Sequence, residues 1–167
     1  MAGQTPGSAE GGLSQSYVTG LTETSLTDLE GVGKVRYENK KWYKWVKYND
    51  GTADLDVVAG DFVNYLAATG YKNSEVVPDT ADADATTPFG AGVVQAAVTV
   101  TATFMWIQII GFATLSLDPT GTPGDSNALT PSATDKAMAV ATASDVEHIC
   151  GHTTDDSAKE VYLDCPW

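Results

Sequence analysis

Apolar and polar residues alternate most regularly over residues 91–117, near the middle of the chain. From Met105 onward the odd-numbered positions carry only apolar side chains or glycine, whereas the even-numbered positions are mixed. A β-strand sends successive side chains to opposite faces, so this period of two predicts a strand with one wholly apolar face. Most of the residues are β-branched, aromatic or small, which favours strands. Gly111 interrupts the run and predicts a bulge or bend.

Shorter segments of the same character lie on both sides of this stretch. A β-hairpin is expected around residues 38–40, and turn-forming residues separate the other segments. One helical turn is expected over residues 25–30. Many short strands with turns between them predict an all-β fold, a compact antiparallel sandwich or barrel. The predicted strands cover residues 32–37, 41–48, 57–66, 71–77, 136–142, 146–150 and 160–164.

The N-terminus has a different composition. Residues 1–16 are mainly small and polar and cannot bury apolar area of their own. We therefore predict an extended N-terminal arm over residues 1–30, of which residues 1–16 are held by another protein chain, and a β domain over residues 31–167. The arm has no basic segment and no apolar core, so no signal peptide is expected. The apolar run at 93–117 has a strand period, so no membrane span is expected either.

The charge is acidic overall and unevenly placed. The net charge of −13 argues against nucleic acid as the main partner. Residues 34–47 nevertheless carry six cationic side chains against one glutamate, whereas residues 49–167 carry 17 acidic side chains against three lysines. Opposite charges on separate parts of a small protein suit lateral association. A hairpin with one solvated face and an acidic surface that aids solubility explains them equally well.

Two cysteines and two histidines near the C-terminus are of the types that bind metal. His148 and Cys150 share a face if this segment is a strand, with His152 close by and Cys165 as a further ligand. Zinc needs three or four ligands in closed geometry, and paired-cysteine spacing is absent, so ordinary strand histidines are favoured over a zinc site. A nucleophilic cysteine with a histidine base is less favoured still, because no oxyanion loop is visible. No cofactor is expected.

Cys150 and Cys165 flank a segment that has the composition of a hairpin turn. Two buried free thiols are favoured over a disulfide between them, because free cysteine is commonly buried and the cytoplasm is reducing. Calcium-ligand candidates are also present, but without the glycine and closing glutamate of a calcium loop, so they are expected to form turns. These candidates are Asp79, Asp82, Asp84, Asp118 and Asp125.

The basic hairpin also carries aromatic residues. Trp42, Tyr43 and Trp45 could stack on a sugar, yet strand aromatics are usually half-buried. The hairpin shows no regular alternation, so both of its faces are expected to be covered, which indicates a subunit interface. The predicted interface residues are Lys34, Arg36, Trp42, Tyr43, Lys44, Trp45 and Lys47.

The order of strand and glycine motifs resembles a known family. The segments Gly33-Lys-Val-Arg-Tyr37, Trp42-Tyr-Lys-Trp-Val-Lys-Tyr48 and Val58-Ala-Gly-Asp-Phe-Val63 are followed by Met105-Trp-Ile-Gln-Ile-Ile-Gly-Phe-Ala-Thr114 and Val161-Tyr-Leu-Asp-Cys-Pro-Trp167. This pattern, over about residues 30–167, is similar to that of small virion proteins of tailed phages, the capsid decoration or cement proteins. Lys136 and the Gly-Phe-Ala sequence depart from the usual pattern.

The resemblance implies a structural role and no enzymatic activity. Such a protein would bind the major capsid protein on the outer surface of the virion, as a homotrimer, and stabilise the shell after synthesis in the host cytoplasm. The alternative is a glycan-binding or tail-associated virion module that uses the hairpin aromatics. Neither nucleic acid nor a membrane is an expected partner.

Overall fold

The computed structural model describes residues 16–69, 74–83, 88–145 and 148–166, and within these residues the protein is all-β. The predicted fold class is therefore confirmed. One short 3-10 turn, Ala67–Thr69, is the sole helical element of the described residues. The strands are β1 (Val35–Glu38), β2 (Lys41–Tyr48), β3 (Phe62–Tyr65), β4 (Glu75–Val77), β5 (Gly90–Val94), β6 (Phe104–Thr114), β7 (Ala128–Pro131), β8 (Met138–Val140), β9 (Gly151–Asp155) and β10 (Glu160–Asp164).

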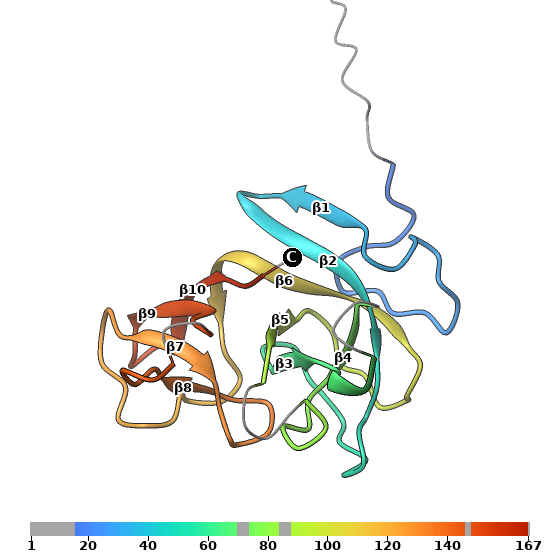
Figure 1. The fold of residues 1–167 in the computed structure, drawn as a ribbon. Coiled ribbons are helices and arrows are strands. Elements are labelled where there is room, and N and C mark those ends of the chain that lie inside the picture. Colours follow the sequence, from blue (N-terminus) through green and yellow to red (C-terminus); the bar gives the residue numbers. More distant parts are fainter. Residues whose placement is uncertain (1–15, 70–73, 84–87, 146–147, 167) are drawn as a thin grey trace, which may run out of the picture.

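Five of the strands close into a small barrel (Figure 1). Their order is β2-β4-β3-β5-β6, and the sheet closes because β6 also pairs with β2 in antiparallel register from Trp42 to Lys47. The β2–β4 pair is parallel, and the other pairs of the barrel are antiparallel. Closure leaves no open edge within these five strands, and β1 is added outside β2 as the other half of the predicted hairpin.

The second half of β6 leaves the barrel and starts a smaller sheet, on the left in Figure 1. Residues Ile110–Thr114 pair with β10, and the order continues through β9 and β7 to β8. The change of partner coincides with Gly111, whose φ of +103° is unfavourable for residues with a side chain. The predicted bend at Gly111 is thus where one strand serves two sheets.

The core lies inside the barrel and continues beneath the second sheet. The odd-numbered residues of β6 are buried, as their alternation predicted. Glycine allows backbone segments to approach closely: for example, a Cβ on Gly92 would collide with the carbonyl oxygen of Gln108, and a Cβ on Gly60 would lie 2.8 Å from the backbone nitrogen of Ser116. These glycines let strand and loop backbones meet where a side chain would separate them.

The predicted boundary of the N-terminal arm at residue 30 is wrong for residues 16–30. This segment packs on the outer wall of the barrel, where Tyr17 and Leu21 contact the buried tryptophans of β2 and β6. Ser25 forms a β-bridge with Phe104, so the expected helical turn at 25–30 is wrong as well. Residues 1–15, the rest of the predicted arm, lie outside the described residues.

The strand predictions succeeded where both ends carried turn signals. The strands predicted at 41–48 and 160–164 have the observed bounds. The strand predicted at 57–66 is shortened to β3, because Val57 to Asp61 form a bridge and a turn instead. Residues 148–150 are not a strand, and β9 begins one residue later. The sequence analysis did not identify β7 and β9.

Candidate functional site

Tyr43, Lys44 and Trp45, three of the predicted interface residues, are buried within the chain itself. Trp45 has no exposed surface, and Tyr43 and Lys44 retain 4% and 8%. These side chains are therefore unavailable to a second subunit in this conformation, which corrects the expectation that they form its contact surface. Both faces of β2 are covered, as predicted, but the cover comes from the barrel interior and from the chain's own residues 17–34.

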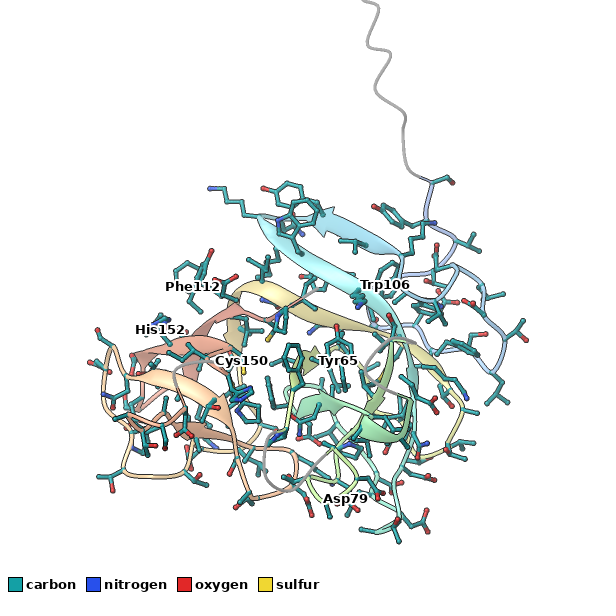
Figure 2. All side chains as sticks on the ribbon, viewed as in Figure 1. Tyr65, Asp79, Trp106, Phe112, Cys150 and His152 are labelled. Carbon is teal, nitrogen blue, oxygen red and sulfur yellow. The ribbon has the colours of Figure 1, made fainter. Side chains whose placement is uncertain are left out.

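The outer face of β2 is closed by two tryptophans that are fixed by hydrogen bonds. Trp45 stacks on Phe104 and contacts Trp106, with ring centroids 6.4 and 5.2 Å apart. Nε1 of Trp45 donates to the Asp28 carboxylate at 2.9 Å, and Nε1 of Trp106 donates to the Thr19 hydroxyl at 2.9 Å. Both acceptors belong to the N-terminal segment, so the indoles bind this segment to the barrel (Figure 2 labels Trp106).

The positive charges of the hairpin are largely neutralised inside the protein. Lys34 pairs with Glu30 at 2.8 Å, Lys47 pairs with Glu75 at 3.4 Å, and Arg36 pairs with Glu38. The Arg36 guanidinium also lies 4.7 Å from the ring centroid of Tyr17. The predicted basic docking surface is thus mostly occupied by intramolecular partners. Lys40 and Lys41 form no ion pair among the described residues.

Glu30 is the electrostatic centre of the N-terminal segment. Loss of water around its carboxylate would raise its pKa, but the hydrogen bonds that it accepts outweigh this effect and lower the pKa to about 2. The donors are the Lys34 ammonium, the backbone and hydroxyl of Thr19, and the backbone of Val18. A carboxylate with this many donors holds two chain segments together.

Lys44 points into the barrel, where its charge meets an aromatic hydroxyl instead of a carboxylate. Its Nζ donates to the Tyr65 hydroxyl at 2.9 Å and lies 4.7 Å from the centroid of that ring. Burial lowers the pKa of Lys44 and raises the pKa of Tyr65. The Tyr65 hydroxyl donates in turn to the carbonyl oxygen of Pro166 at 3.4 Å, which connects the barrel interior to the C-terminal segment.

A cavity of about 220 Å³ lies beside this connection. Cys150 and Cys165 line it as buried free thiols, and Sγ of Cys165 lies 3.6 Å from the carbonyl oxygen of Cys150. Contact with the Cys150 side chain and burial raise the pKa of Cys165, so this thiol stays protonated. The full lining is Phe89, Gly90, His148, Ile149, Cys150, Asp164, Cys165 and Pro166.

Three of the four candidate zinc ligands, His148, Cys150 and Cys165, line one cavity, and His152 does not. Nδ1 of His148 is buried without a hydrogen-bond partner. His152 belongs to β9 and points to solvent, as Figure 2 shows. Among the described residues no three histidine, cysteine or acidic side chains are grouped closely enough to hold a metal ion.

The acidic side chains considered for calcium accept hydrogen bonds from turns or form an ion pair. Asp79 accepts from the backbone of Ala53 and Ala81, and Asp82 accepts from Thr52. Asp118 pairs with Lys159, and Asp125 accepts from the backbone of Asp156. Asp84 lies outside the described residues.

The sequence analysis missed one feature of the surface, an exposed aromatic pair. Phe112 and Tyr162 are 60% and 40% exposed and stand opposite each other on β6 and β10. The signal is present in the sequence, because Phe112 belongs to the mixed face of the alternating run.

Comparisons with known proteins add no relative. No family model, no curated protein and no solved structure matches this chain. No helix within the described ranges is long and apolar enough to cross a membrane. The resemblance to phage decoration proteins, the absence of enzymatic activity and the homotrimer therefore stay predictions.

Proposed function

We propose that this chain is a structural virion protein that binds the outer surface of a tailed-phage capsid and stabilises it. The supporting observation is that the residues that carry the resemblance build the β framework. Trp45 and Trp106 fix the N-terminal segment, Gly60 permits a close backbone contact, and Gly111 lets β6 serve two sheets. These motif residues have packing and backbone roles, which suits a structural protein that binds a partner through its surface.

The N-terminal segment supports the same proposal. Residues 16–34 are attached to the barrel wall through Glu30 and the two tryptophans. Residues 1–15 precede this segment in the sequence and are mainly small and polar. Small and polar residues of this kind bind by becoming ordered along a partner surface. In the proposed function that surface belongs to the major capsid protein.

The glycan-binding alternative loses its predicted platform. Tyr43 and Trp45 are buried within the chain, and of the three proposed stacking residues Trp42 alone retains intermediate exposure. A flat sugar-stacking surface needs ring faces open to solvent. We therefore do not adopt this alternative.

The test uses capsids assembled from the major capsid protein alone. The full chain is expected to co-sediment with them saturably and to raise the temperature at which they dissociate. A chain lacking residues 1–15 should bind more weakly while keeping the circular dichroism spectrum and melting temperature of the full chain. Absence of co-sedimentation by the full chain would refute the proposal.

A further inference from the structure

Phe112 and Tyr162 form an exposed apolar knob on the outer face of the second sheet. Their rings meet edge to face with centroids 5.2 Å apart, and the neighbouring residues on both strands, Ala113 and Val161, point into the core. His152 stands opposite Tyr162 on β9. Phe112 and His152 lie on the same side of the molecule in Figure 2. Two large aromatic side chains on a rigid, exposed sheet are the composition of an interaction surface.

A shallow depression of about 230 Å³ lies directly beside the knob. It is lined by Lys41, Phe112, Ala113, Thr114 and Glu160. The absence of a side chain at Gly111 makes room for Lys41, because a Cβ there would lie 3.2 Å from Cγ of the lysine. Lys41 and Glu160 line the same depression, yet neither forms an ion pair among the described residues.

We propose that this surface binds a second copy of this chain. A knob beside a depression, with one cation and one anion at its edge, is complementary to itself: the aromatic pair of one copy meets the depression of the other. Lys41 of each copy then faces Glu160 of its neighbour. Symmetric contacts between identical chains use such self-complementary surfaces, with aromatic residues as anchors.

Charge disfavours a contact through the acidic loops. The chain carries a net charge of −13, so contact between two copies at an acidic region would be repulsive. The depression beside Phe112 has one cation and one anion, and the exposed Asp164 lies farther along the same face of β10, whereas Asp79 lies at the opposite end of the molecule in Figure 2. The contact therefore joins the copies away from the acidic loops that contain Asp79 and Asp82.

The first test measures the mass of the capsid-free full chain against concentration by sedimentation velocity. The wild type is expected to have the mass of a dimer and to dissociate on dilution, because a self-complementary contact is two-fold. Phe112→Ala and Tyr162→Ala should each raise the dissociation constant at least about tenfold, as truncation of an interface anchor does. Val100→Ala, at a residue 53% exposed in the loop before β6, is the matched control and should change nothing.

The second test uses charge reversal to show that the contact is between molecules. Lys41→Glu alone and Glu160→Lys alone should each associate more weakly, because each variant brings like charges together. An equimolar mixture of the two variants should associate again, since each supplies the charge that the other needs. This recovery cannot come from pairing within one chain.

Three results would overturn the inference: a wild type that is monomeric at every concentration, a mass unaffected by Phe112→Ala, or no recovery in the mixture. Binding of a glycan or another protein that depends on Phe112, by a chain that stays monomeric, would assign the surface to that ligand instead. All arms are carried out without capsids. Failure here therefore leaves the proposed capsid binding intact, and failure of capsid binding leaves this inference intact.

Discussion

Replacing Trp45 by alanine should lower the free energy of unfolding of the protein. Trp45 has no exposed surface, stacks on Phe104 and contacts Trp106, and its Nε1 donates to Asp28. Truncating a large buried aromatic side chain costs about 3–5 kcal/mol, which is a large share of the stability of a small domain. The expected result for Trp45→Ala is a loss of this size in the free energy of unfolding.

A graded series separates packing from hydrogen bonding at this position. Trp45→Phe keeps an aromatic ring but removes the donor to Asp28, and hydrogen bonds to charged groups contribute about 1.5–3 kcal/mol. The control is Leu26→Ala, because Leu26 is 72% exposed and its truncation should change stability by less than about 0.5 kcal/mol. Unfolding is measured by urea titration and followed by circular dichroism, because replacing a tryptophan changes the fluorescence signal itself.

The same series decides between the two interpretations of Trp45. If Trp45→Ala lost less than about 1 kcal/mol while the mass of the oligomer fell, the residue would belong to a subunit interface, as the sequence alone predicted. The described contacts predict the reverse. The fold should weaken first, and any change in assembly should follow from unfolding.

Three further predictions concern charge and backbone. Because the pKa of Glu30 is lowered from 4.5 to about 2, its stabilising effect is complete above about pH 4.5 and lost as the pH falls towards 2; the difference in unfolding free energy between wild type and Glu30→Gln should shrink over this range. Gly60→Ala should cost roughly 1–3 kcal/mol more than Gly31→Ala in thermal unfolding, because both have positive φ but only Gly60 has backbone within 3 Å of the added Cβ. Tyr65→Phe should destabilise by roughly 1–3 kcal/mol in urea, since it leaves the buried Lys44 ammonium without its acceptor, and an unchanged midpoint would contradict this role.

Local patterns were sufficient for the individual strands that end in clear turns. Lys41–Tyr48 and Glu160–Asp164 were predicted with their observed bounds, because each is a β-favouring run between turn-forming residues. β9 was missed because Gly151-His-Thr-Thr-Asp155 is polar on one face and short, and its neighbours were interpreted as the strand instead. The turn at residues 58–61 is held by local hydrogen bonds between Val58 and Asp61, and the distant residue Ser116 also donates to the carbonyl oxygen of Gly60.

The candidate site was predicted from charge and residue type. The structure shows that most of its side chains are buried or paired within the chain itself. The sequence indicated a basic aromatic hairpin with both faces covered, and both faces are covered. It could not show that Glu75 neutralises Lys47, because this partner is chosen by the packing of separate segments.

By itself, the sequence determined that this protein is all-β, that β6 has one fully apolar face, and that Gly111 is a bend. These properties follow from side-chain alternation and backbone sterics, which act within a few residues. Only the tertiary structure decided that β2 and β6 close a barrel, that residues 16–34 cover Trp45, and that Phe112 stays exposed. Burial and pairing are set by segments that are distant in sequence but meet in space, so no local pattern contains them.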